Sequence, residues 1–263
     1  MENVLQHFRK EEQPFIEQVV NIMREVEDRY APKLTDFLDP RQQFIVDSIR
    51  RQYGDIESVS DGALEDVERK RVLLYPTYYV PTDDDFAMTV VEVHYPNKFV
   101  TLRHKDVLGS MMSLGIDRSK FGDIRVEDGA IQFVVATEVI DYVRANFVGI
   151  GKVKVHIEIV EDRLKYFQQH EEWTSESLTV SSLRLDTVIS AVFNISRQKS
   201  SALIQSGKVK VNWSEKDQIS MELQESDLIS IRGLGRVKIL MIEGRTKKDK
   251  IRLQIGRLEQ KIK

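Results

Sequence analysis

Residues 183–212 constrain the fold of this chain more than any other segment, because they specify a helix, a tight link, a second helix and a strand in direct succession. The apolar residues of 185–192 recur at the spacing of one helical face. Ser196 is a typical cap for the start of a second helix, and Gly207 is a typical residue at its end. Lysines and valines then alternate over 208–211, as in a strand with one buried face.

The second of these helices begins with cations. Arg197 and Lys199 lie in its first turn, where the helix dipole disfavours positive charge. Free backbone N–H groups and the dipole attract phosphate at that end of a helix. An external anion such as an RNA backbone is therefore one interpretation of this pattern. A small helical hairpin with a solvated basic edge is the alternative, and the segment alone leaves both open.

The distribution of charge separates this part of the chain from the rest. The whole chain carries a net charge of −3, but residues 178–263 hold 17 Lys and Arg against 9 Asp and Glu. Residues 1–177 hold 22 against 33. A basic domain attached to an acidic remainder of the chain is typical of a protein that binds nucleic acid. Charge alone does not distinguish RNA from DNA or from an anionic lipid.

The composition excludes several classes of protein. The chain has no cysteine, which excludes disulfides, thiolate zinc sites and cysteine nucleophiles. No segment approaches the ~20 consecutive apolar residues that a membrane-spanning helix needs. The N-terminal residues lack the apolar core of a secretion signal. We therefore expect a cytoplasmic protein without a membrane span.

The order of sequence patterns predicts an α+β protein with three domains. Residues 1–72 are predicted to form a mainly helical N-terminal domain. Residues 73–165 are predicted to form a ferredoxin-like plait with the element order βαββαβ. A polar linker is expected over 166–182, before a basic C-terminal domain over 183–263.

The plait prediction depends on four changes between strand and helix periodicity. The expected elements are a strand at 86–95, a helix at 105–114, strands at 123–126 and 131–135 around an Asp128-Gly129 turn, a helix at 137–147 and a strand at 152–160. RRM domains share this framework and stack RNA bases on aromatic residues of the two central strands. The third strand here lacks the aromatic and basic spacing of an RRM, so Phe133 is assigned to the core.

Catalytic and metal-binding patterns are missing from the sequence. None of the five histidines has the spacing of metal ligands, and His94 and His156 are interpreted as ordinary strand residues. The acidic run 83–85 is interpreted as solvated. The Gly-Leu-Gly-Arg segment at 233–236 lies between strands, so it is not a dinucleotide fingerprint. We predict a binding protein that is not an enzyme, without a cofactor, a catalytic residue or a metal site.

The segment from Leu183 onward resembles an S4 domain, an RNA-binding module. Its hallmarks are Arg-Leu-Asp at 184–186, Ser-Arg at 196–197, a helix ending in LIQSG, and a strand that closes at Asn212. Residues 226–239 resemble the closing strand pair of the module. Trp213 and Ser226 depart from the pattern, because S4 domains often have glycine at both positions. Enzymes that carry S4 domains need further motifs, such as a nucleotide-binding or glycine-rich cofactor loop, which this sequence lacks.

The whole chain resembles the YlmH family of bacterial proteins. That family has a helical N-terminal domain, a plait and a C-terminal S4 domain. The resemblance is strongest in RHKDVLGSMMSLGIDRSKFGDI (103–124), DGAIQFVV (128–135) and ATEVIDYVRANF (136–147). FLDPRQQ (37–43) and VERKR (67–71) also fit.

The resemblance implies a protein that binds large-subunit rRNA and tRNA in ribosome-associated quality control, where nascent chains on stalled large subunits are extended. The alternative is a cell-division scaffold that binds a protein partner. The expected RNA-binding residues are Arg184, Ser196, Arg197, Lys199, Lys208, Lys210, Arg236 and Lys238. Additional RNA contacts are considered at Arg103, His104, Lys105, Arg118 and Lys120. For this second group, helix capping by Asp106 and solvation of the basic residues stay open as the alternative.

Overall fold

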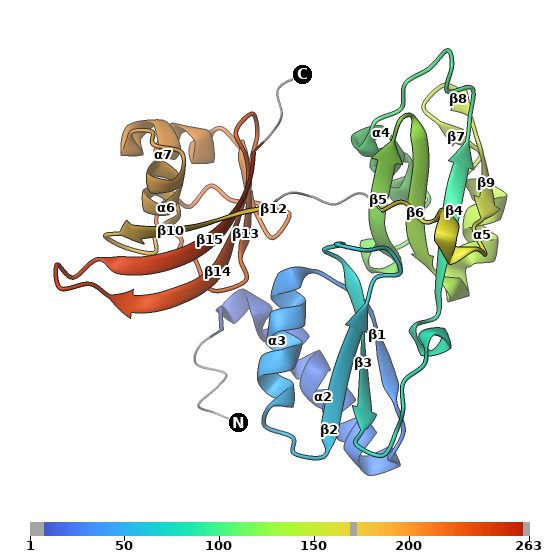
Figure 1. Cartoon of the computed structure of the whole chain (residues 1–263), viewed down its shortest axis with the longest axis horizontal. Coiled ribbons are helices and arrows are strands. Elements are labelled where there is room, and N and C mark those ends of the chain that lie inside the picture. The colour runs from blue at the N-terminus through green and yellow to red at the C-terminus, as the bar shows by residue number, and fades with distance from the viewer. Residues whose placement is uncertain (1–7, 169–172, 260–263) are drawn as a thin grey trace. The chain divides into compact units, whose positions relative to one another are not determined.

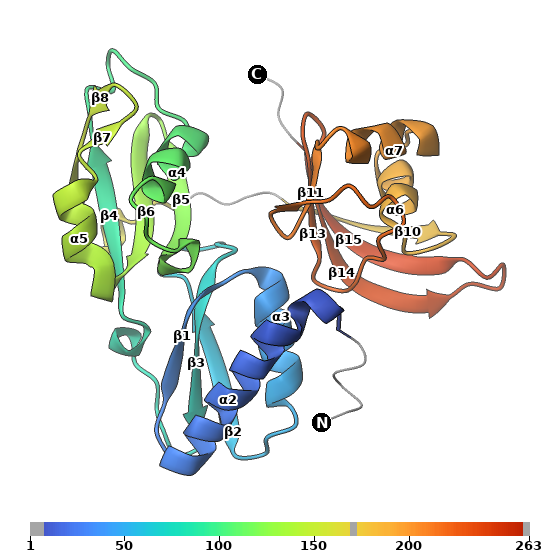
Figure 2. The same cartoon turned by 180° about the vertical axis from the view of Figure 1, so that it is seen from behind.

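The structure of the chain is a computed structural model that describes residues 8–168 and 173–259 (Figures 1 and 2). It divides into two compact units, residues 1–170 and residues 171–263. The first unit contains an N-terminal part and the plait. The second contains the basic domain. The α+β class predicted from the sequence is confirmed.

The N-terminal part consists of two helices packed on a three-stranded antiparallel sheet with the order β1-β3-β2. Its elements are α2 (Gln13–Arg29), β1 (Lys33–Leu38), α3 (Pro40–Arg50), β2 (Ile56–Asp61) and β3 (Lys70–Pro76). The carboxylate of Asp39 accepts a hydrogen bond of 2.8 Å from the backbone N–H of Gln42 and so caps α3. The predicted helices are present, but the prediction of a mainly helical domain omitted the sheet. The boundary expected at residue 72 lies inside β3.

The plait has the predicted order of elements and the antiparallel sheet β5-β6-β4-β9. Its bounds are β4 (Met88–His94), α4 (His104–Met112), β5 (Phe121–Glu127), β6 (Ala130–Ala136), α5 (Ile140–Asn146) and β9 (His156–Ile159), with a short hairpin of β7 (Gly149–Ile150) and β8 (Val153–Lys154) before β9. The turn at Asp128-Gly129 has positive φ angles of 45° and 83°, as a tight hairpin requires. Phe133 is fully buried, and its ring packs edge-to-face against Phe147 at 5.6 Å.

One face of the plait sheet is covered by the N-terminal part. Phe37, Leu64 and Val67 form a buried cluster with plait residues that include Val90 and Val134. A Cβ atom on Gly122 would lie 3.0 Å from the ring of Phe37 and 2.9 Å from Val134, so this approach requires glycine. The covered face is the one on which RRM domains stack RNA bases. That mode of RNA binding is therefore blocked over this region of the sheet.

Hydrogen bonds hold the two parts of the first unit together. The guanidinium of Arg69 donates to the backbone oxygens of Phe121 at 3.1 Å and Phe37 at 2.7 Å. The carboxylate of Asp123 accepts from the backbone N–H groups of Glu68 at 2.7 Å and Arg69 at 3.3 Å. The contacts join residues that are 32 to 55 positions apart in the sequence. The N-terminal part and the plait therefore form one compact unit.

The second unit is a six-stranded sheet with two helices on one face. The sheet has the order β10-β15-β14-β13-β11-β12. Its elements are β10 (Thr174–Val180), α6 (Leu185–Val192), α7 (Arg197–Gln205), β11 (Val209–Val211), β12 (Ser214–Glu215), β13 (Leu228–Ile231), β14 (Gly235–Arg245) and β15 (Ile251–Glu259). The apolar face of α6 packs on inward-facing residues of the sheet, as its periodicity predicted. β10 corrects the linker expected at 166–182, because residues 174–180 pair along their whole length with β15.

The two departures from the S4 pattern lie at strained backbone positions. Trp213 has a φ of 62° and Ser226 a φ of 65°, in the left-handed region where side chains clash with the backbone. Nearby, the amide nitrogen of Asn212 donates to the carboxylate of buried Asp227 at 2.9 Å, and the Asn212 amide oxygen accepts from the backbone N–H of Leu228 at 2.9 Å. The turns are therefore held by side-chain contacts in spite of the strain.

Replacing Ser226 with glycine is expected to stabilise the second unit by about 1 kcal/mol, because glycine adopts a positive φ without steric cost. Both tryptophans of the chain, Trp173 and Trp213, belong to this unit. Urea unfolding followed by tryptophan fluorescence therefore reports on it alone. Ser177→Gly in β10 is the control, and it should destabilise the unit, because glycine weakens a strand. A Ser226→Gly midpoint at or below that of the wild type would contradict the prediction.

Candidate nucleic-acid interface

A buried carboxylate orders two of the predicted RNA-binding arginines. Asp186, at the start of α6, is only 3% exposed. Its oxygens accept hydrogen bonds from Arg184 at 3.0 and 3.3 Å and from Arg197 at 2.6 Å. Burial raises the pKa of Asp186, but these hydrogen bonds and the two positive charges outweigh it and lower that pKa below its usual value. Both guanidinium groups remain partly exposed, with side-chain exposures of 40% and 55%.

The start of α7 follows the sequence prediction. The hydroxyl of Ser196 accepts from the backbone N–H of Lys199 at 3.2 Å, so Ser196 is the cap. Lys199 is exposed in the first turn, and Ser200 is buried and donates to the backbone oxygen of Asp186 at 2.7 Å. Gly207 follows the helix with a φ of 67°. Arg197 and Lys199 thus lie at the helix end that attracts anions.

A second group of cations lines a groove on the other face of the sheet. Lys208, directly before β11, and Lys210, within it, alternate with buried Val209 and Val211, so they point away from the helices. The groove has a volume of about 690 Å³. We call it the basic groove, and the cations that line it are Lys208, Lys210, Arg232 and Arg236. Glu215 is the one anion among its lining residues within the described part of the chain.

Strand register explains why these residues meet. Lys210 lies opposite Ser230 on β13, and Ser230 lies opposite Arg236 on β14. A single row therefore crosses three strands on one face. The predicted residue Lys238 follows two positions after Arg236 and points to the same face, where it is half-buried.

The sequence prediction missed two participants in this face. Arg232, in the turn after β13, lines the basic groove. Trp173, which the sequence assigned to a linker, lies over Gly256 of β15, and the guanidinium carbon of Arg236 is 5.5 Å from its ring centroid. A cation over an indole ring is an attractive pair. The basic turn at 232–236 was a local signal that could have included Arg232 among the RNA-binding residues. No local pattern could have placed Trp173 on this face, because the strand that it packs against is some 80 residues away in the sequence.

The first group of additional candidates in the plait is exposed. Arg103, His104 and Lys105 lie at the start of α4 with exposed side chains. The carboxylate of Asp106 accepts from the backbone N–H of Arg103 at 3.0 Å and from its side chain at 3.3 Å, which completes a capping arrangement. Hydrogen bonding from the backbone of Arg103 lowers the pKa of Asp106. RNA contact at these three residues stays a prediction.

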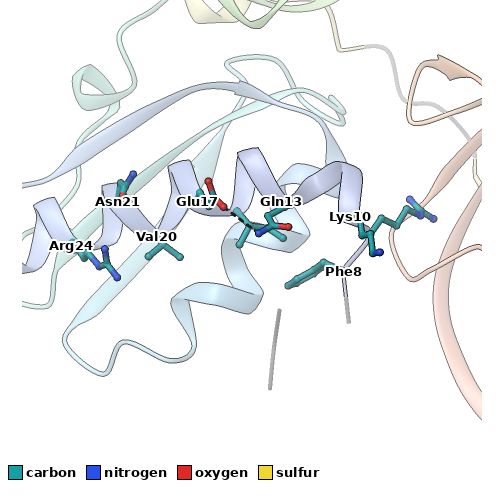
Figure 3. A pocket seen from close by; sticks show the side chains of 9 residues that line it. Phe8, Lys10, Gln13, Glu17, Val20, Asn21 and Arg24 are labelled. Atoms are coloured by element: carbon teal, nitrogen blue, oxygen red, sulfur yellow. Dashed lines mark hydrogen bonds between the residues drawn. The ribbon is translucent and has the colours of Figure 1, made fainter. Parts of the chain in front are cut away.

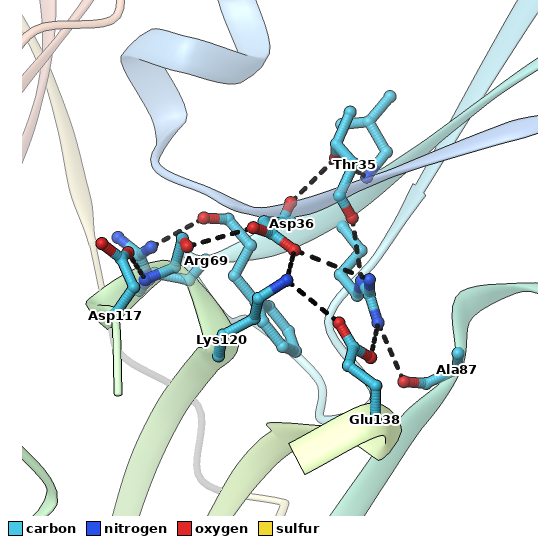
Figure 4. A network of polar contacts seen from close by, with 11 residues as sticks. Thr35, Asp36, Arg69, Ala87, Asp117, Lys120 and Glu138 are labelled. Carbon is cyan, nitrogen blue, oxygen red and sulfur yellow. Dashed lines mark hydrogen bonds and ion pairs between the residues drawn. The ribbon is translucent and has the colours of Figure 1, made fainter. Parts of the chain in front are cut away.

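Arg118 and Lys120 have internal partners instead. The guanidinium of Arg118 donates to the backbone oxygens of Phe121 at 2.5 Å and Gly122 at 3.1 Å, and burial lowers the pKa of Arg118 to about 10. The ammonium of Lys120 donates to Asp36 at 2.5 Å and to Glu138 at 3.1 Å (Figure 4). Both cations therefore make contacts that stabilise the first unit, and RNA contact at these two residues stays a prediction.

Replacing Lys120 with methionine is expected to destabilise the first unit by about 1 kcal/mol, because Asp36 and Glu138 lose a shared cation. The first unit contains no tryptophan, so urea unfolding is followed by circular dichroism and the fluorescence transition of the second unit is subtracted. Lys105→Met, at an exposed position of the plait, should change stability by less than about 0.5 kcal/mol. Equal midpoints for the two variants would show that the contacts of Lys120 contribute nothing.

The first unit also has a small cavity beside α2 (Figure 3). Its volume is about 300 Å³, and Phe8, Val20 and Arg24 are among its lining residues. Gln13 donates to Glu17 there at 3.3 Å. None of the predicted RNA-binding residues lies in this cavity.

The described residues show no centre for metal chemistry. Within residues 8–168 and 173–259, no group of three or more His, Cys, Asp or Glu side chains is arranged to hold a metal ion. In the same residues, no helix is long and apolar enough to cross a membrane.

Comparisons with known proteins agree with this arrangement. Three family profiles match in order: "YlmH, N-terminal" over residues 11–79, "Putative RNA-binding domain in YlmH" over 81–163 and "S4 domain" over 183–229. A relative from Bacillus subtilis (strain 168), named "Ribosome-associated protein quality control protein P2", is 41% identical over 258 residues, which cover 98% of this chain and 99% of the relative. The chain belongs to the YlmH family.

A solved structure supports the YlmH assignment of the fold. It is described as "Cell division protein ylmH from Streptococcus pneumoniae", and it is 34% identical with a TM-score of 0.53. The match covers 61% of this chain and 98% of that one. The resemblance of the sequence to the YlmH family is thus confirmed. Arg232 and Arg236 of the basic groove lie beyond the residues that match the S4 profile.

Proposed function

We propose that this chain binds RNA through the basic groove and the arginine pair of Asp186, and that it acts in ribosome-associated quality control on large-subunit rRNA and tRNA. The observation that carries the proposal is the convergence of four cations in one groove with a single carboxylate. Lysines and arginines in such a groove suit the regularly spaced phosphates of an RNA backbone. The name of the Bacillus subtilis relative supports the assignment to quality control.

The two cationic groups suit different tasks. The basic groove contains two lysines, which are mobile point charges, and two arginines, which bind phosphate in a bidentate way. Arg184 and Arg197 are held by Asp186, so their orientation is fixed before RNA arrives. Pre-ordered donors lose less side-chain entropy on binding. The groove therefore supplies affinity, and the arginine pair supplies a defined orientation toward the RNA backbone.

The proposed mechanism is stabilisation by binding, without catalysis and without a cofactor. The second unit binds rRNA and tRNA backbones while a peptidyl-tRNA is retained on the large subunit. Crosslinking of the protein to RNA in cells, followed by sequencing of the bound fragments, tests this directly. We expect fragments of large-subunit rRNA and tRNA. Fragments drawn from messenger RNA without either of these would contradict the proposal.

A second candidate function is that of a cell-division scaffold. The name of the Streptococcus pneumoniae relative and the excess of acidic residues over 1–177 favour it. Fractionation of a lysate on a sucrose gradient separates the two functions. Co-migration with large ribosomal subunits supports the RNA-binding function, whereas a nuclease-insensitive complex at the septum, without ribosomal co-migration, supports the scaffold.

A further inference from the structure

Two histidines that the sequence assigned to ordinary strand positions meet on the plait. His94, at the end of β4, lies directly opposite His156, at the start of β9. Their rings are stacked, with centroids 4.9 Å apart and an angle of 16° between the planes. The Nε2 atom of His94 lies 3.1 Å from a carboxylate oxygen of Glu158. The pair is accessible, because His156 is exposed and the side chain of His94 is 37% exposed.

The histidine pair lines a cavity of about 470 Å³. Its other lining residues include Tyr95, Asn97 and Lys154. The hydroxyl of Tyr95 donates to the backbone oxygen of Gly129 at 2.5 Å, which fixes the wall of the cavity against the β5–β6 turn. The volume lies in the range of sites for small ligands, about 300–1,000 Å³.

The position of the cavity distinguishes it from the rest of the plait sheet. Side chains alternate along β4, so His94 points to the same face as Val90, which the N-terminal part covers. On β9 and the residue after it, His156 and Val160 share that face in the same way. The cavity is therefore the open end of a sheet face that is closed elsewhere.

Two segments with exposed cationic or aromatic residues lie at this end of the plait. The loop from β4 to α4 and the β7–β8 hairpin lie at the same end of the plait (Figures 1 and 2). The loop presents Lys98 and Phe99, whose side chain is 87% exposed. The hairpin presents Lys152 and Lys154, both exposed. Exposed aromatic rings and cations are the side chains that contact the bases and the backbone of single-stranded RNA.

We propose that this cavity is a nucleobase-binding site for a single-stranded nucleotide of RNA. The base stacks on the imidazole pair, the amide of Asn97 hydrogen-bonds to its edge, and Lys154 contacts the adjoining phosphate. Histidine rings are among the side chains on which unpaired RNA bases stack. This inference rests on the proposed function, since the ligand is RNA, but it concerns a different surface and a different type of contact.

The test uses the full chain and a seven-nucleotide RNA of uridines with a central 2-aminopurine, whose fluorescence is quenched by stacking. The wild type is expected to quench the probe. His94→Ala with His156→Ala should abolish the quenching and weaken binding about 10-fold or more, because a stacked base contributes strongly to affinity. His94→Phe with His156→Phe keeps the ring faces and should retain quenching and affinity within about threefold. Lys154→Gln should weaken binding and lower its salt dependence while quenching at saturation remains.

The outcomes separate this inference from the proposed function. Replacement of the basic-groove cations should reduce rRNA affinity and leave the quenching unchanged. Absence of quenching in the wild type, or full quenching in the double alanine variant, would overturn the nucleobase site, and the proposed function would stand if groove variants still lose rRNA binding. Loss of quenching in both the alanine and the phenylalanine variants would also overturn it, because ring stacking would then not be the cause. Quenching of the probe without binding of rRNA or tRNA would overturn the proposed function, whereas the inference of a nucleobase site would stand.

Discussion

Replacing Lys208, Lys210, Arg232 and Arg236 with glutamine is expected to lower the affinity of the chain for large-subunit rRNA about 100- to 1,000-fold at 0.1 M salt. The four side chains line one groove, and each phosphate contact releases condensed cations from the RNA. The slope of log K against log salt should therefore become shallower by about three units. Titration of labelled rRNA fragments at several salt concentrations measures both quantities.

A control with the same change in charge makes the result specific. Lys10, Arg24, Arg29 and Arg51 are exposed cations of the first unit that lie outside the groove. Their replacement with glutamine should shift the affinity by less than about threefold, because none of the four lines the groove and exposed charges without a direct contact are screened by salt. Equal losses in the two quadruple variants would mean that net charge, and not the groove, determines binding.

Replacing Asp186 with asparagine is expected to destabilise the second unit by about 1–2 kcal/mol. The substitution removes a buried carboxylate that accepts from both Arg184 and Arg197. The estimate is below the cost of breaking a fully buried ion pair, because both arginines are partly exposed. Urea unfolding followed by tryptophan fluorescence measures the change. Asp217→Asn, at an exposed position, should change stability by less than about 0.5 kcal/mol.

The effect of Asp186 depends on pH in a defined direction. Its pKa in the folded chain is lower than in the unfolded chain, so the carboxylate adds stability that is fully present above about pH 4. That stability is lost as the pH falls through the folded-state pKa. The difference between the wild type and Asp186→Asn should therefore be constant from pH 6 to 8 and shrink below about pH 4. A difference that grows on acidification would contradict the role of the charged form.

The sequence predicted correctly the helix ends and turns that depend on only a few neighbouring residues. The cap at Ser196, the stop at Gly207 and the turn at Asp128-Gly129 each act within a few residues, and all three are present in the structure. The strands β1 and β2 escaped prediction, because neither shows a clear alternation of buried and exposed residues. Tertiary packing against α2 and α3, rather than local preference, makes them strands.

The candidate site was harder to predict, because its members come from distant segments. Asp186 belongs to a motif that the sequence showed, but its contact with Arg197 depends on the angle between two helices. Trp173 meets Arg236 only through the pairing of β10, β15 and β14. His94 and His156 are 62 positions apart and meet by strand register. Periodicity reveals which face a residue occupies and says nothing of its neighbour across the sheet.

The contact of Phe37, Leu64 and Val67 with the plait sheet has a consequence for how such a chain evolves. If recombination near residue 80 separated the N-terminal part from the plait, Val90, Val134 and Ala136 of the plait would become an exposed apolar surface. The separated plait would then aggregate with other copies of itself through this surface. The N-terminal part and the plait therefore depend on each other to keep this surface buried, whereas the compact second unit has a core of its own.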